Sequence, residues 1–234
     1  MRVIILAGGR GTRLAEETGT IPKPMVTVGE KPILWHIMNS YASYGHKEFL
    51  IATGYLSEVI DEWVDQLSDP WSVDTLFTGL ETQTGGRIKQ CLEHCEDETV
   101  MATYGDGLAN VDLSELISFH QKHSFTATLT AVKPPARFGV VEFQNEEVAY
   151  FGEKPPSDMN WINGGFFVLE RRILDYISSP DEPFETGALP RLVSTGSLGA
   201  FRHDGFWKPM DTLREKQEFD VLAQHEIPPW RSHN

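Results

Sequence analysis

The chain has 234 residues, of which 40% are hydrophobic and 23% charged, so it is long enough to bury one sizeable core. Its formal net charge of −14 argues against binding to nucleic acid or to an anionic membrane, because both need clustered lysine and arginine. We therefore expect small-molecule partners. If these carry phosphate groups, an acidic protein must concentrate its few cations locally or bind a divalent metal ion.

Strand-like and helix-like segments alternate through the first half of the chain. Short apolar runs predict buried strands at 2–6, 48–53 and 99–104, and a further strand that ends at Leu76 and Phe77. Helical spacing of apolar residues predicts helices at 33–44, 57–67 and 87–95. The alternation predicts an α/β fold with right-handed crossovers and an open, mostly parallel sheet, whose ligands bind at the carboxyl ends of the strands.

The second half predicts a mixed-sheet extension, with strands at 125–132, 139–143, 148–152 and 165–169 and helices at 113–123, 171–178, 186–195 and 212–224. Asp211 or Thr212 is the expected N-cap of the last helix. We expect the polar tail 228–234 to be frayed. The prediction is one domain over 1–234, with one half at 1–110, a second half at 111–227 and the tail at 228–234.

Cellular location is predicted from what the chain lacks as well as from its cysteines. No apolar run approaches the length of a membrane span, and the N-terminal strand continues into a glycine loop, unlike a signal peptide. Cys91 and Cys95 suit two buried thiols in a reducing compartment. We expect a cytoplasmic protein.

A glycine-rich turn follows the first strand, in the run Leu6-Ala7-Gly8-Gly9-Arg10-Gly11-Thr12-Arg13. Three glycines let backbone amides turn inward and cradle a polyphosphate, and Arg13 adds a cation. The spacing differs from both the dinucleotide-binding pattern and the lysine-containing phosphate loop. A bare turn is the alternative interpretation.

Three further charged residues suit phosphate and metal binding. Prolines flank Lys23 and fix its backbone, which suits a cation held against charge that builds on a leaving pyrophosphate. Asp106 and Asp211 are hard oxygen ligands, and two carboxylates with substrate phosphates and waters suffice for Mg²⁺. The alternatives are a solvated lysine, a turn residue at Asp106 and a helix cap at Asp211.

A second set of polar residues in the second half could receive another substrate. Lys154 suits a sugar phosphate, Glu153 and Asn163 carry acceptors for hydroxyl groups, and Gly164 allows close approach of a sugar ring. These residues could also serve only as turn residues.

The chain resembles the sugar nucleotidyltransferases, and most of all their cytidylyl-transferring branch, over nearly its whole length. The motifs that carry the resemblance are GGRGTRL, PKPM, TGGR, YGDG, RFG, EKP, WINGGFFV and GFWKPMDT. The resemblance implies a GT-A-like, Rossmann-like nucleotidyltransferase fold and a Mg²⁺-dependent reaction. In that reaction CTP and glucose 1-phosphate give CDP-glucose and pyrophosphate, without a covalent enzyme intermediate.

The resemblance also assigns site residues. It implies catalytic roles for Arg13, Lys23 and Asp106, and metal ligation by Asp106 and Asp211. The implied nucleotide-binding residues are Leu6, Ala7, Gly8, Gly9, Gly11, Thr12, Arg13, Lys23, Thr84, Gly85, Gly86, Arg87 and Asp106. The implied substrate-binding residues are Tyr104, Gly139, Glu153, Lys154, Asn163 and Gly164.

The segment 63–79 is shorter here than in the family, where we expect the longer segment to shape a subunit contact and part of the nucleotide pocket. A homo-oligomer and the base preference are therefore left open. The alternatives are UTP or dTTP as the nucleotide, CTP with another sugar phosphate, and a non-catalytic nucleotide-sugar-binding protein. A GT-A glycosyltransferase is disfavoured because Gly107 and Leu108 follow Asp106, where an Asp-x-Asp metal motif would be expected.

Overall fold

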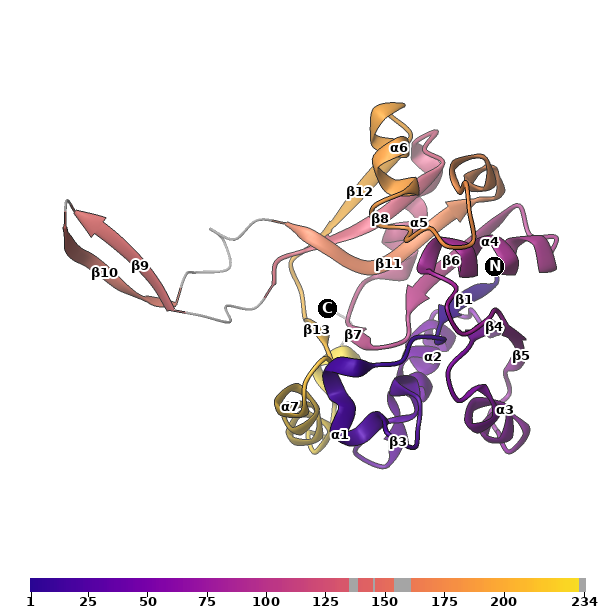
Figure 1. Ribbon diagram of the computed structural model, residues 1–234, viewed down its shortest axis with the longest axis horizontal. Helices are drawn as coiled ribbons and strands as arrows, with labels where there is room; N and C mark the ends of the chain where they lie inside the picture. The colour runs from indigo at the N-terminus through magenta and orange to yellow at the C-terminus, as the bar shows by residue number, and fades with distance from the viewer. Residues whose placement is uncertain (135–138, 145, 154–160, 232–234) are drawn as a thin grey trace.

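A seven-stranded sheet forms the centre of the molecule in the computed structural model, which describes residues 1–134, 139–144, 146–153 and 161–231 (Figure 1). The strand order is β12-β8-β11-β6-β1-β4-β5. All neighbouring pairs are parallel except those of β11, which runs antiparallel to both β6 and β8. The strands are β1 (Val3–Leu6), β4 (Glu48–Thr53), β5 (Ser72–Phe77), β6 (Thr99–Tyr104), β8 (Ala127–Val132), β11 (Ile162–Glu170) and β12 (Leu198–His203).

Helices cover both faces of this sheet and enclose two hydrophobic clusters. Alternation along β1 sends Val3 and Ile5 into one cluster and Ile4 into the other. The first cluster packs α2 (Ile33–Ser43), α3 (Ser57–Asp65), α5 (Leu113–Lys122) and α7 (Leu213–Ala223). The second packs α4 (Thr84–His94), α6 (Ala188–Ser194) and the 3₁₀ helix η4 (Arg171–Tyr176). The result is the predicted α/β architecture in three layers.

Three two-stranded sheets lie outside the central one. They pair β2 (Thr27–Val28) with β3 (Lys31–Pro32), β7 (Gly107–Ala109) with β13 (Trp207–Pro209), and β9 (Gly139–Gln144) with β10 (Glu147–Glu153). The remaining elements are η1 (Thr12–Leu14), α1 (Ala15–Thr18), η2 (Lys23–Met25) and η5 (Pro229–Arg231). Figure 1 shows the β9–β10 hairpin extending away from the central sheet.

The predicted elements agree with the structure in type and place, with one exception among the helices. Residues 171–176 form a 3₁₀ helix where the sequence predicts an α-helix. Thr212, and not Asp211, is the N-cap of α7: its hydroxyl accepts from the Glu215 amide in a capping box. No helix in the described part of the chain combines the length and apolar character that a membrane crossing requires.

The prediction of a frayed tail is wrong for residues 228–231. Trp230 is only 2% exposed and packs edge-on against His36 and Phe219, with Phe206 at a tilt. An indole ring buries a large apolar area, which outweighs the entropy of a short polar tail. Residues 232–234 lie outside the described part of the chain.

Candidate active site

A cavity of about 730 Å³ lies where the glycine loop leaves β1 and where β6 ends. Its volume is in the range of small-molecule sites. Of the predicted nucleotide-binding residues, its lining includes Leu6, Ala7, Gly8, Gly9, Gly11, Thr12, Arg13, Lys23, Thr84, Arg87 and Asp106. Residues from distant parts of the sequence therefore meet at the carboxyl edge of the parallel strands, as the fold predicts.

The conformation of the glycine loop depends on two of its glycines. Gly11 has φ of +61°, a left-handed conformation that other residues rarely adopt. Gly8 lies so close to Arg87 that an added Cβ would sit 2.0 Å from its Nη1 atom. The loop is tied to the end of β4, where the Tyr55 amide donates to the Gly8 carbonyl at 3.2 Å.

Arg87 holds the glycine loop in place through hydrogen bonds. Its side chain is buried, and its guanidinium donates to the carbonyl oxygens of Thr53 at 2.9 Å and Gly8 at 3.0 Å, and to the Thr78 hydroxyl. Burial lowers the pKa of the guanidinium from its ordinary value. Arg87 lines the cavity as the sequence predicts, but the structure shows it positioning protein groups.

Gly85 and Gly86 do not line the cavity. An added Cβ at Gly85 would lie 2.6 Å from the Glu182 carbonyl oxygen, and one at Gly86 would lie 2.2 Å from that of Pro180. Glycine is required here because the start of α4 packs directly on the backbone of 180–184. Their predicted contact with nucleotide stays a prediction.

Lys23 joins the two aspartates predicted as metal ligands. Its Nζ atom lies 2.6 Å from Asp106 Oδ2 and 2.7 Å from Asp211 Oδ1, and Arg13 Nη1 lies 2.8 Å from Asp211 Oδ2. The side chains of Lys23 and Asp211 are 9% and 11% exposed, whereas that of Arg13 is 71% exposed. Pairing of β7 with β13 and a bond of 2.8 Å from the Met210 amide to the Asp106 carbonyl bring the two aspartates together.

This arrangement fits a divalent cation. Two carboxylates that contact one ammonium group can also reach one metal ion, and Mg²⁺ prefers such oxygen ligands. In the described part of the chain no three histidine, cysteine, aspartate or glutamate side chains gather into a ligand set. The aspartates therefore suit a metal that completes its coordination with substrate oxygens and water.

A second cavity of about 330 Å³ adjoins the first and shares Arg13, Tyr104, Asp106 and Asn163 with it. Gly164, Trp207 and Asp211 also line it. The Trp207 indole donates to the Gly164 carbonyl at 2.8 Å and fixes this turn. The structure thus brings Tyr104, Asn163 and Gly164, three of the predicted substrate-binding residues, beside the two aspartates that the sequence predicts as metal ligands.

The structure does not test the other predicted substrate-binding residues. Gly139 and Glu153 pair with each other in the β9–β10 hairpin. Lys154 lies outside the described residues, as does the side chain of Glu153. Their assignments stay predictions.

Glu185 also lines the larger cavity, but the sequence analysis does not identify it. Its carboxylate accepts hydrogen bonds from the Tyr104 hydroxyl and, at 2.7 Å, from the Thr84 hydroxyl. Glu185 follows the buried Phe184 in a turn between Pro183 and Gly187, and such a pattern predicts only a turn. Only its position in the fold identifies it.

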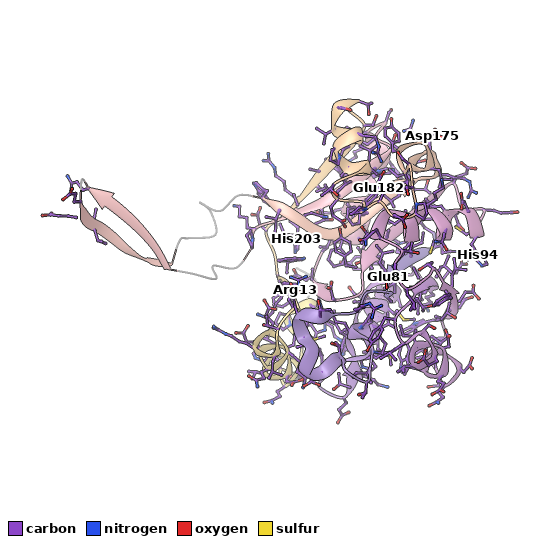
Figure 2. All side chains as sticks on the ribbon, in the orientation of Figure 1. Arg13, Glu81, His94, Asp175, Glu182 and His203 are labelled. Carbon is purple, nitrogen blue, oxygen red and sulfur yellow. The ribbon has the colours of Figure 1, made fainter. Side chains whose placement is uncertain are left out.

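Figure 2 shows Arg13 and Glu81 among the side chains near the glycine loop. Arg10, at the tip of this loop, lies 2.7 Å from Glu81 Oε1, and both side chains are largely exposed. Such an exposed ion pair contributes little stability.

Comparison with known proteins gives a consistent result. The model of the nucleotidyl transferase family matches residues 2–213. A glucose-1-phosphate cytidylyltransferase of Salmonella typhi is 44% identical over 255 aligned positions that cover 99% of both chains. The alignment is longer than this chain of 234 residues, so that relative has residues without a counterpart here.

More distant relatives share the fold. A mannose-1-phosphate guanyltransferase of Yarrowia lipolytica is 33% identical over 91% of this chain and 62% of its own length. The crystal structure of HddC from Yersinia pseudotuberculosis superposes with a TM-score of 0.77 at 25% identity, covering 95% of this chain and 99% of HddC.

Proposed function

The chain belongs to the nucleotidyl transferase family, and we propose that it is a glucose-1-phosphate cytidylyltransferase, which converts CTP and glucose 1-phosphate to CDP-glucose and pyrophosphate. The observation that carries the proposal is the convergence of Lys23, Arg13, Asp106 and Asp211 where the two cavities adjoin. A non-catalytic relative would have no need to keep all four.

The glycine loop binds the triphosphate of CTP in this proposal. Backbone amides of Gly8 to Thr12 face phosphate oxygens without a side chain in the way, and Arg87 holds the loop in this shape from below. Thr84 lines the opposite wall. The loop thereby fixes the α-phosphorus relative to the second cavity.

Glucose 1-phosphate occupies the second cavity, with its hydroxyl groups against Asn163 and Gly164. An oxygen of its phosphate attacks the α-phosphorus of CTP, and the bond from that phosphorus to the oxygen that bridges to the β-phosphate breaks. Pyrophosphate leaves with that bridging oxygen. Lys154 would steady the sugar phosphate, a role that stays a prediction from the sequence.

Lys23 and Arg13 stabilise the charge that develops during transfer. Both reach the region between the two cavities, and the flanking prolines hold the backbone of Lys23 in place. Asp106 and Asp211 would hold Mg²⁺, which when bound neutralises phosphate charge and orients phosphate oxygens. Catalysis of this kind consists of positioning and charge stabilisation.

The test is pyrophosphate release with Mg²⁺ across a grid of CTP, UTP, dTTP, ATP and GTP against several hexose 1-phosphates, with EDTA as a control. We expect EDTA-sensitive release with CTP and glucose 1-phosphate. Release with another pair would keep the reaction and change the substrates, and no release with any pair would refute the proposal.

Variants test the site within the same assay. Asp106→Asn and Asp211→Asn should each abolish most turnover with the fold intact. Lys23→Ala should lower kcat more than it raises KM, because its cation is assigned to charge that grows in the transition state. Wild-type rates in either aspartate variant would remove that residue as a metal ligand.

A further inference from the structure

We propose that Glu185 is a positioning residue for the hexose phosphate, and that it acts through the Tyr104 hydroxyl to hold the Asn163 carboxamide with its amino group toward the sugar. The inference rests on the proposed function, which places the sugar beside Asn163. It adds a residue whose carboxylate is held by the Tyr104 and Thr84 hydroxyls.

A backbone amide sets the direction of the hydrogen bonds among Asn163, Tyr104 and Glu185. The Gly165 N–H can only donate, so the atom that faces it at 2.9 Å is Asn163 Oδ1. The amino group Nδ2 of Asn163 therefore faces the Tyr104 hydroxyl, at 3.1 Å, and the hydroxyl oxygen accepts. The single proton of Tyr104 must then point elsewhere, and it points to Glu185.

Glu185 is well suited to accept this hydrogen bond, because a carboxylate is an acceptor only. Its second oxygen is fixed by Thr84, whose own hydroxyl accepts at 2.8 Å from the Phe184 amide. Within the described residues no lysine, arginine or histidine forms an ion pair with Glu185.

Removal of the acceptor at position 185 would reverse the direction of the hydrogen bond between Tyr104 and Asn163. The Tyr104 proton would turn toward Asn163 and meet a second donor, and the carboxamide could avoid this only by turning over. It would then lose the Gly165 amide and present its oxygen in place of its amino group. Because Asn163 lines both cavities, the turned carboxamide would present the wrong group where the sugar binds.

The experiment measures KM for glucose 1-phosphate, KM for CTP and kcat in four variants. Glu185→Met removes both acceptors and should raise KM for glucose 1-phosphate about tenfold, while KM for CTP and kcat stay within about twofold. Glu185→Gln keeps one oxygen for Tyr104 and should restore most of the affinity. Tyr104→Phe should match Glu185→Met, and the double variant Glu185→Met/Tyr104→Phe should be no worse than either single one.

A matched control separates the loss of this hydrogen-bond relay, which runs from Asn163 through Tyr104 to Glu185, from a general loss of negative charge. Glu81→Gln removes a carboxylate from the rim of the same cavity, where the side chain is 81% exposed, and should leave KM for glucose 1-phosphate unchanged. If Glu185→Met fails to fold, Tyr104→Phe still tests the relay, because it removes one hydroxyl and keeps the ring.

Three results would overturn the inference: multiplicative effects in the double variant, a Glu185→Gln variant as poor as Glu185→Met, or a change confined to KM for CTP. Each would mean that Glu185 acts directly or on the nucleotide. Failure of the proposed function is recognised separately, because the wild-type protein would then release no pyrophosphate with any sugar phosphate.

Discussion

Replacement of Lys23 by methionine should raise the affinity of the nucleotide-free protein for Mn²⁺ by at least tenfold. Lys23 donates to Asp106 at 2.6 Å and to Asp211 at 2.7 Å, and its side chain is only 9% exposed. Its ammonium therefore neutralises the two carboxylates that a divalent cation needs. A cation that arrives without nucleotide must displace it, whereas CTP can offer phosphate oxygens to the released lysine.

The size of the effect follows from the two bonds that must break. A hydrogen bond to a charged group contributes roughly 1.5–3 kcal/mol, so displacement of Lys23 from both aspartates costs about 3–6 kcal/mol before the ammonium is rehydrated. A tenfold change in affinity corresponds to about 1.4 kcal/mol, which leaves room for that rehydration. Arg13 remains in the variant, but it is 71% exposed, and its bond to Asp211 contributes less.

The assay is electron paramagnetic resonance of free Mn²⁺ titrated with protein, which measures binding without turnover. Lys31→Met is the matched control, because it removes the same charge from an exposed position in β3. We expect tighter Mn²⁺ binding in Lys23→Met alone, and no such gain when CTP is present. Equal or weaker binding without CTP would refute the idea that Lys23 holds the metal-binding aspartates before the nucleotide enters.

Three further predictions concern stability. Arg87→Met removes the buried guanidinium that donates to the Thr53 and Gly8 carbonyls and should lower the free energy of unfolding by about 2–4 kcal/mol in urea denaturation; an unchanged midpoint would contradict this. Trp230→Ala should cost about 3–5 kcal/mol by the same method, because the ring is buried, whereas a frayed tail would make it neutral. The pKa of His36 is lowered, chiefly by burial, so the unfolded chain binds more protons below about pH 6.5. Stability should fall as pH drops through that value, and His36→Gln should flatten the dependence; an equally steep curve in the variant would assign it to other groups.

The middle strands of the central sheet could be predicted from the sequence because they are buried on both faces, whereas the half-exposed edge strand β12 was not predicted. Continuous apolar runs such as 48–53 and 99–104 have no other stable place than the interior of a parallel sheet, and the structure gives both strands the predicted limits. The glycine loop was recognisable for a local reason as well, since Gly11 needs a conformation that few residues adopt.

The remaining features depend on tertiary contacts that leave no local pattern. The strands β7 and β13 have three residues each and form only because they pair with one another, yet they bring Asp106 to Asp211. Glu185 gains its partners from β6 and α4, which lie far from it in sequence. Trp230 is buried by residues from α2 and α7, so a tail that looks polar in sequence packs against the core.

The wall that the two cavities share also bears on inhibition. Arg13, Tyr104, Asp106 and Asn163 line both cavities, so the two cavities are close enough for one ligand to contact both. A compound that links a cytidine analogue to a hexose phosphate mimic would lose translational freedom once, while its two ends bind at high effective concentration. The linked compound should bind more tightly than either half alone, provided that the length of the linker matches the distance between the two bound halves.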